Sequence, residues 1–188
     1  MNRFKPKEHL IGERIILLKR EETHEEEMIE AINESRNELR EYLFWVDGTK
    51  DLSDVKKATQ MFKKQWEEDV EWAYDIYELD THILLGSIGV HNIKFINRSA
   101  ELGYWLRTSK TNQGYMKEAI LILEKELFEH GIHRLTICCD VFNKKSSNTA
   151  IRAGYKLESV AKEAIYHYTG LHDIETYVKF SPYPLTGF

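Results

Sequence analysis

The sequence has few cysteines, few prolines and no long hydrophobic run. Its 188 residues include two cysteines and three prolines, which excludes a disulfide-stapled fold. Cys138 and Cys139 are adjacent, so a strand would point them to opposite faces, and we expect reduced thiols in or near the core. No run of about 18 apolar residues could form a membrane span, and Met1–Lys7 lacks the apolar segment of a secretion signal. We therefore expect a cytoplasmic protein without a membrane partner.

Basic residues are outnumbered by acidic ones. There are 26 lysines and arginines against 31 aspartates and glutamates, for a formal net charge of −5. Nucleic-acid-binding proteins carry a basic stripe, and its absence predicts no nucleic-acid partner. The acidic surplus is compatible with a cationic acceptor, although a solvated acidic surface explains it more simply. The length fits one domain, 1–188, that buries roughly 70% of its unfolded surface.

Hydrophobic periodicity and turn residues predict the order of the elements. Thr23 and Ser53 are expected to cap the first two helices. The expected strands are 11–19, 71–78, 83–92, 99–106, 134–140 and a pair within 155–180, and the expected helices follow Thr23 and span 53–69, 113–130 and 145–152. This predicts an α/β fold with a mixed, mostly antiparallel sheet of about seven strands and about four helices. One strand–helix–strand crossover makes one parallel pair, whose strands splay apart and admit a ligand.

Residues 101–155 contain the most informative pattern. Glu101–Leu106 is a strand, Asn112–Ala119 is a glycine-bearing loop that opens a long helix, and Asn143–Ser146 is a polar turn that opens a second helix before Gly154-Tyr155. The N-terminus of a helix offers free N–H groups and the positive end of its dipole to a phosphate. Two such ends beside neighbouring strands predict a site for an extended, phosphorylated ligand.

With these motifs, the chain resembles GNAT-superfamily N-acetyltransferases of the RimJ/RimL branch. The resemblance extends from Gly12–Leu17 through Leu43–Asp47 to Tyr168–Asp173. It implies a GNAT domain that uses acetyl-CoA as the acyl donor, transfers the acetyl group directly to an amine, and needs no metal. Because dimers are common in this branch, a homodimer is also expected.

The resemblance also assigns the cofactor residues. The family's phosphate loop, (Gln/Arg)-x-x-Gly-x-(Gly/Ala), falls on residues 109–114, where Ser109 and Asn112 depart from it. Asparagine tolerates the left-handed backbone conformation better than most residues, so the loop can persist. The backbone N–H of Leu106 is expected to face the thioester oxygen. The full expected cofactor set is Trp105, Leu106, Asn112, Gln113, Gly114, Tyr115, Met116, Asn143 and Ser146.

Two kinds of catalytic residue are expected from the resemblance. Ser146 is the candidate proton donor to the departing thiolate, because the position of the family's tyrosine acid is Ala150 here; Asn143 and Ser146 could instead serve only as helix caps. Glu101 is the first candidate base, acting directly or through water, with an ion-paired surface glutamate as the alternative. A second base position of the branch falls on Ile165. Glu163, two residues earlier on the same predicted strand face, is the second candidate.

The sequence gives a less specific signal for the residues that would bind the acceptor amine. Tyr42, Phe44 and Trp45 are candidates for the acceptor mouth, although core packing is the common fate of such aromatic residues. His167 and His172 straddle a predicted hairpin turn, and no metal site is expected. The expected acceptor is the N-terminal α-amine of a protein or peptide. The alternatives are a small amine, such as a polyamine, an antibiotic or an amino-acid derivative, and a non-catalytic acyl-CoA-binding sensor.

Overall fold

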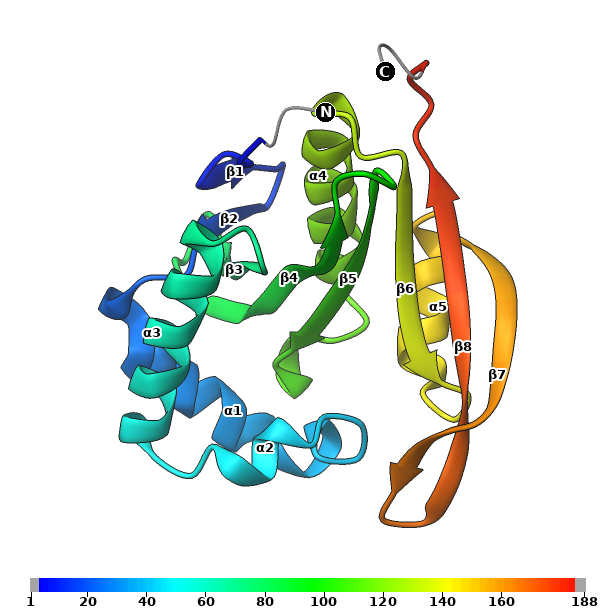
Figure 1. The fold of residues 1–188 in the computed structure, drawn as a ribbon. Coiled ribbons are helices and arrows are strands. Elements are labelled where there is room, and N and C mark those ends of the chain that lie inside the picture. The colour runs from blue at the N-terminus through cyan, green and yellow to red at the C-terminus, as the bar shows by residue number, and fades with distance from the viewer. Residues whose placement is uncertain (1–3, 185–188) are drawn as a thin grey trace.

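The computed structural model describes residues 4–184, which form one eight-stranded sheet covered by helices (Figure 1). The sheet order is β1-β2-β3-β4-β5-β6-β8-β7, and only β5 and β6 are parallel. The strands are β1 (His9–Ile11), β2 (Ile15–Lys19), β3 (Trp72–Glu78), β4 (Leu84–Lys94), β5 (Ser99–Leu106), β6 (Arg134–Asp140), β7 (Lys156–His167) and β8 (Gly170–Phe180). The predicted fold class is confirmed, with β1 as an additional edge strand.

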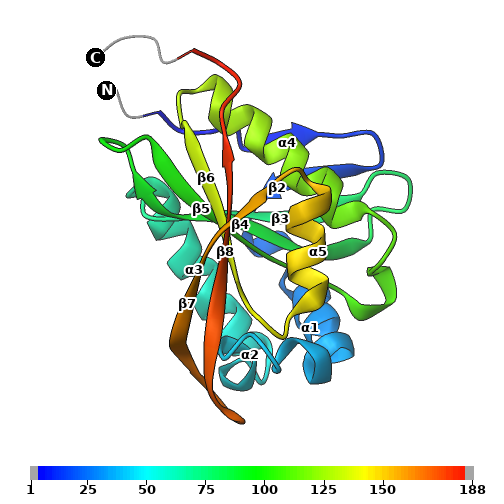
Figure 2. The same cartoon turned by 90° about the vertical axis from the view of Figure 1, so that its right-hand side faces the viewer.

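Two groups of helices cover the two faces of the sheet (Figures 1 and 2). The α-helices are α1 (Glu25–Leu39), α2 (Trp45–Gly48), α3 (Leu52–Glu67), α4 (Tyr115–Glu129) and α5 (Lys144–Arg152), and short 3-10 turns span Glu22–His24 and Thr108–Lys110. The larger buried cluster lies between the sheet and α4, and a smaller one lies under α1–α3. Within residues 4–184, no helix is long and apolar enough to cross a membrane.

The predicted caps of the first two helices are wrong. Thr23 lies in the 3-10 turn, and His24 occupies the N-cap of α1 without a side-chain cap bond. The cap of α3 is Asp51, whose carboxylate accepts hydrogen bonds from the backbone N–H groups of Ser53 at 2.8 Å and Asp54 at 3.3 Å. Ser53 therefore lies inside the first turn, because an aspartate two residues earlier satisfies the free N–H groups there.

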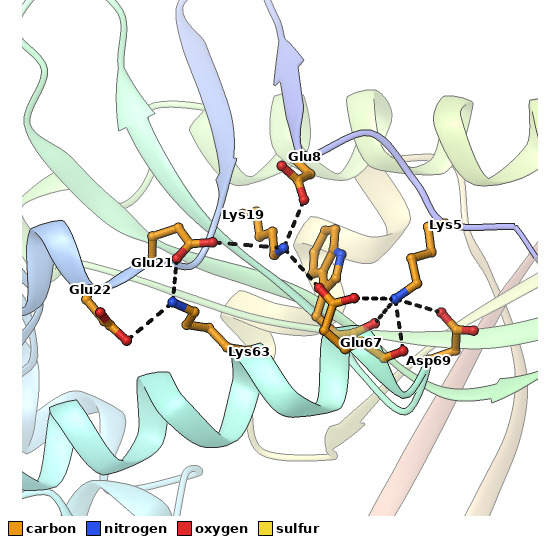
Figure 3. Close-up of polar contacts among 9 residues, drawn as sticks. Lys5, Glu8, Lys19, Glu21, Glu22, Lys63, Glu67 and Asp69 are labelled. Carbon is orange, nitrogen blue, oxygen red and sulfur yellow. Dashed lines mark hydrogen bonds and ion pairs between the residues drawn. The ribbon is translucent and has the colours of Figure 1, made fainter.

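Ion pairs join the segment before β1 to β2 and α3 (Figure 3). The Lys19 ammonium lies 2.8 Å from Glu8 and 3.3 Å from Glu67, and Lys5 lies 3.0 Å from Glu67. Ion pairs at the protein surface contribute about 0–1 kcal/mol each to the free energy of unfolding. They join α3 to β2 and to the segment before β1, while the buried apolar clusters supply most of the stability.

The parallel pair of strands is joined at only one end. The β5–β6 pairing comprises Ser99–Arg134, Ala100–Leu135 and Glu101–Thr136. Beyond that point β5 runs on to Leu106, while β6 runs to Asp140 and stays paired with β8 on its other side. Figure 1 shows the two strands diverging. The predicted splayed pair is confirmed, and it leaves backbone groups of β5 and β6 open to a ligand.

The two cysteines lie on opposite faces of β6, as predicted. Cys139 is buried, and burial raises the pKa of its thiol to about 11. Cys138 is exposed, so the expectation that both thiols lie in or near the core is wrong for this residue. Helices α1–α3 lie across the split from β6 in Figure 1.

Candidate functional site

The loop that opens α4 adopts a left-handed conformation at two positions. Gly114, the N-cap, has φ +84°, and Asn112 has φ +61°. Asn112 thus takes up the conformation that a glycine in its place would favour. Within residues 4–184 no side chain caps α4, so the N–H groups of Gly114, Tyr115 and Met116 face outward from the helix end. The Gln113 side chain donates to the carbonyl of Ser109 at 3.0 Å and stiffens the loop.

Arg14 adds a positive charge beside this loop that the sequence analysis missed. Its guanidinium donates to the Gln113 carbonyl at 3.1 Å and pairs with Glu118 at 3.0 Å. A Cβ atom added to Gly114 would lie 3.4 Å from Arg14 Nη2. A guanidinium next to a free helix N-terminus favours a phosphate group. No local pattern could reveal it, because 99 residues separate Arg14 from Gln113.

Near its C-terminal end, β5 pairs with β4 on one edge, and its other edge faces the gap between β5 and β6. The Arg107 N–H donates to the Leu85 carbonyl on β4 at 2.7 Å. Because successive N–H groups of a strand point to opposite edges, the Leu106 N–H faces away from β4, toward the split. Gly86 allows the close approach, since a Cβ atom there would lie 2.2 Å from the Trp105 carbonyl oxygen. Of the two residues predicted here, Leu106 therefore has its N–H at the opening, whereas the backbone of Trp105 pairs with Ser87 on β4.

The N-terminus of α5 holds the serine that was expected to donate a proton. The Asn143 side chain accepts from the Ser146 N–H at 3.1 Å, so its predicted cap role is confirmed. The Tyr104 hydroxyl lies 3.2 Å from Ser146 Oγ and 3.3 Å from the Ser146 carbonyl oxygen. Burial raises the pKa of Tyr104, which keeps this hydroxyl protonated as a donor. Tyr104 was missed, although strand alternation places it on the same face as the buried Leu102.

Glu101 lies where the split begins, with partners on both carboxylate oxygens. His91 Nε2 is 3.3 Å from one oxygen, and Asn92 donates to the other at 3.0 Å. Burial alone would raise the pKa of Glu101, but the hydrogen bonds with His91 and Asn92 outweigh it and lower that pKa. The same bond raises the pKa of His91. Glu101 is therefore an ionised, paired carboxylate at the root of the opening.

Glu163 does not occupy the position expected of it. The pairing of β7 with β8 shifts register between Ala161 and Ile165, and Glu163 has φ +49° in this bulge. Its N–H donates to Asp173 at 2.9 Å, and the residue is exposed. This bulge interrupts the alternation on which the prediction for Glu163 rested, so the role of Glu163 as second base stays a prediction.

A pocket of about 820 Å³ lies between the end of α1 and the β7–β8 hairpin. Phe142, which forms part of its wall, immediately precedes Asn143, so the pocket adjoins the N-terminus of α5. Tyr42 also lines the pocket and donates to the Phe142 carbonyl at 3.3 Å. The complete lining is Asn37, Arg40, Glu41, Tyr42, Phe142, His167, Tyr168, Thr169, Leu171 and His172.

Of the other two aromatic candidates for the acceptor mouth, Phe44 packs against residues of the pocket wall and Trp45 packs against Trp105. The ring of Phe44 lies 4.7 Å from that of His167 and 6.0 Å from that of Tyr168. The ring of Trp45 lies 6.0 Å from that of Trp105, and neither Phe44 nor Trp45 is among the lining residues. Of the three, only Tyr42 faces the pocket directly.

Two histidines of the pocket wall, His167 and His172, contact a buried aspartate behind it, a polar group that the sequence analysis did not assemble. Asp140 ends β6, and its carboxylate lies 2.6 Å from His172 Nδ1 and 3.8 Å from His167 Nε2. The two imidazole rings stack at 5.0 Å. Two ligands of one tetrahedral zinc ion would lie roughly 3.3 Å apart, given bonds of about 2.0–2.1 Å. The shorter Asp140–His172 distance is that of a hydrogen bond.

Comparisons with known proteins agree with this geometry. A family model described as an acetyltransferase (GNAT) domain matches residues 14–156. The chain is 27% identical over 159 residues to the ribosomal-protein-serine acetyltransferase of Escherichia coli, covering 84% of this chain and 88% of that protein.

Solved structures of acetyltransferases share the fold. The ribosomal-protein α-N-acetyltransferase RimL in complex with coenzyme A has a TM-score of 0.87 at 24% identity, covering 92% of this chain and 98% of that one. The microcin self-immunity acetyltransferase MccE in complex with acetyl-CoA and AMP has a TM-score of 0.85 at 26% identity, covering 89% and 93%. The chain therefore belongs to the GNAT family and is an N-acetyltransferase whose acyl donor is acetyl-CoA.

Proposed function

We propose that this N-acetyltransferase acts on the N-terminal α-amine of a protein or peptide. The observation that supports the proposal is the open form of the pocket beside α5. Phe142, Tyr168 and Leu171 line it and are 63%, 60% and 55% exposed. A trough with an open rim admits an extended chain, whereas a small metabolite is usually enclosed on most of its surface. The similarity to the E. coli ribosomal-protein-serine acetyltransferase favours the same class of acceptor.

The walls of the pocket carry groups that suit a peptide N-terminus. Glu41 provides negative charge for the ammonium group, and Asn37 and Arg40 provide donors for carbonyl groups of the following residues. Tyr42 offers an aromatic face for the first side chains. The Tyr168 hydroxyl bonds to Asp47, which also pairs with Arg40 at 3.2 Å, so the hairpin is braced against α2.

On the donor side, the chain's own residues suit direct transfer of the acetyl group. The α4 N-terminus, Asn112 and Arg14 would hold the pyrophosphate of acetyl-CoA. The Leu106 N–H would stabilise the oxyanion that forms when the amine attacks the thioester carbon. Ser146, with Tyr104 behind it, would give a proton to the departing thiolate. Glu101 and Glu163 stay predicted bases; neither lines the pocket.

An acceptor screen tests the proposal. Purified protein is incubated with acetyl-CoA and peptides that begin with serine, alanine or methionine, and product is read by mass spectrometry. Each peptide has a matched control of identical sequence with a blocked N-terminus and one internal lysine. Polyamines, aminoglycosides and free amino acids form the small-amine arm. We expect acetylation of free N-termini and none of the blocked controls.

The other outcomes separate the alternatives. Turnover confined to small amines would overturn the peptide proposal, and the similarity to MccE provides the reason to include that arm. Acetyl-CoA binding by calorimetry without turnover of any amine would instead favour an acyl-CoA sensor. Replacing Ser146 with alanine tests the donor side: unchanged turnover between pH 7 and 9 would show that Ser146 is only part of the helix cap.

A further inference from the structure

We propose that Thr169, His172 and Asp140 form a proton relay that deprotonates the acceptor ammonium in this pocket. The inference rests on the proposed function, since it assigns the residues that prepare the amine for attack. An α-amine has a pKa of about 7.7–8.0, so most of it is protonated at neutral pH. A protonated amine has no lone pair, and a base must remove one proton before the C–N bond can form.

The three side chains lie in one hydrogen-bonded line. Thr169 Oγ1 is 2.6 Å from His172 Nε2, and His172 Nδ1 is 2.6 Å from Asp140 Oδ2. The second Asp140 oxygen accepts from the Phe142 N–H at 2.8 Å, which fixes the carboxylate. With Nδ1–H donating to Asp140, Nε2 of the neutral imidazole is free to accept a proton from the threonine hydroxyl.

The line runs from the interior to the open pocket. Asp140 is 5% exposed, the His172 side chain is 13% exposed, and Thr169 lies at the exposed turn of the β7–β8 hairpin. Both Thr169 and His172 line the pocket. His167 is 4% exposed and stacks on His172, so it shields the Asp140–His172 hydrogen bond from water. A buried carboxylate without a lysine or arginine partner among its hydrogen bonds and ion pairs in residues 4–184 is suited to stabilise an imidazolium.

The proton balance is complete without a further reactant. The ammonium N–H passes a proton to Thr169 Oγ1 while the threonine O–H proton moves to His172 Nε2, and Asp140 stabilises the imidazolium that results. The amine lone pair then forms the C–N bond, and the C–S bond breaks. The second amine proton leaves with the thiolate by way of Ser146. His172 returns its proton to water through the pocket.

Several charged or titratable groups surround His172. From β6 there is Asp140, from β7 His167, from its own strand Asp173, and across the pocket Arg40, Glu41 and Tyr42. Asp140, Asp173 and Glu41 are negative and Arg40 is positive, so the groups around His172 in this set carry a net negative charge.

The test compares pH profiles of kcat/KM for the intact enzyme and its variants, with a peptide bearing a free α-amine. The substitution His172→Asn keeps a donor near Asp140 but removes the acceptor at Nε2. We expect it to lower kcat/KM by about 100-fold at pH 7, the lower range of general-base catalysis. The loss should shrink as the pH rises past the pKa of the amine. Thr169→Val should show the same loss and Thr169→Ser should restore activity, while the acetyl-CoA Kd stays unchanged.

Controls separate failure of the relay from failure of the proposed function. His82, exposed at the β3–β4 turn, provides a matched histidine-to-asparagine control expected to be neutral. If the wild type acetylates peptides while His172→Asn keeps its pH profile, the relay is overturned and the proposed function stands. If the wild type acetylates only small amines, the proposed function fails and the same variants are assayed with that amine. One equivalent of zinc retained by the purified enzyme and lost in His172→Asn would also overturn the relay.

Discussion

Gly114 is the position where one added methyl group should damage both the fold and the cofactor site. The residue caps α4 with φ +84°, a conformation that costs a non-glycine residue about 1–2 kcal/mol. Alanine recovers about 0.4–1 kcal/mol by restricting the unfolded chain. The net loss for Gly114→Ala is therefore roughly 1 kcal/mol, or about 2–4 °C in Tm for a domain of this size.

The same substitution should weaken acetyl-CoA binding. The new methyl would contact Arg14 Nη2 at 3.4 Å, and the loop can relax only by moving the N–H groups offered to the phosphates. If half to all of the strain is relieved in this way, the Kd rises by roughly twofold to fivefold. Isothermal calorimetry measures the Kd, and calorimetric or fluorescence melting measures the Tm.

Gly48→Ala is the matched control. Gly48 lies within α2, has no positive φ, and a Cβ atom there would meet nothing within 4 Å. This variant should retain the wild-type Kd and show an equal or higher Tm. If Gly114→Ala were as stable as Gly48→Ala and bound acetyl-CoA as tightly as the wild type, the loop would not have the conformation described.

Three further outcomes are expected. Glu101→Gln should lower the pKa of His91 in an NMR titration, because Glu101 raises that pKa. While Glu101 stays ionised, the contribution of His91 to stability is complete below the unfolded-state pKa of histidine and is lost as the pH rises through the folded-state pKa. Lys179→Met should cost about 2 kcal/mol in urea unfolding, less than the roughly 3–5 kcal/mol of a fully buried pair, because it leaves the buried Glu124 unpaired. Cys139, with its raised pKa, should resist iodoacetamide at pH 8 until the chain unfolds, and rapid labelling of the native protein would contradict its placement.

Much of the architecture could be predicted from the sequence because each long element has a strong hydrophobic period. The β5–α4–β6 crossover and its splay follow from such periods and from the fixed geometry of parallel strands. Helix ends were less predictable, since Asp51 and Ser53 compete for the same N–H groups and only the backbone conformation decides between them. Asn143 had no such competitor, and its cap was predicted correctly.

The acceptor side could not be predicted in the same way because its contacts join distant segments. The bulge around Glu163 depends on how β7 pairs with β8. No residue type in β7 predicts a bulge at this position. Asp140 and His172 are 32 residues apart, and their hydrogen bond requires β6 and β8 to be neighbours. The sequence contains all of these residues, but the sheet order decides which of them meet.

The gap between β5 and β6 has a consequence for the abundance of the enzyme in a cell. Between residues 4 and 184, β5 and β6 pair over only three residues each, so an unliganded chain has strand edges inside its own sheet that do not pair with each other. Acetyl-CoA bound in this gap would supply hydrogen-bond partners to the folded chain and would stabilise it against unfolding. A free concentration of 100 times the Kd would add about 2.7 kcal/mol to the unfolding free energy. Proteolytic turnover of the chain should then slow when acetyl-CoA is plentiful, so metabolic supply would set the amount of enzyme as well as its rate.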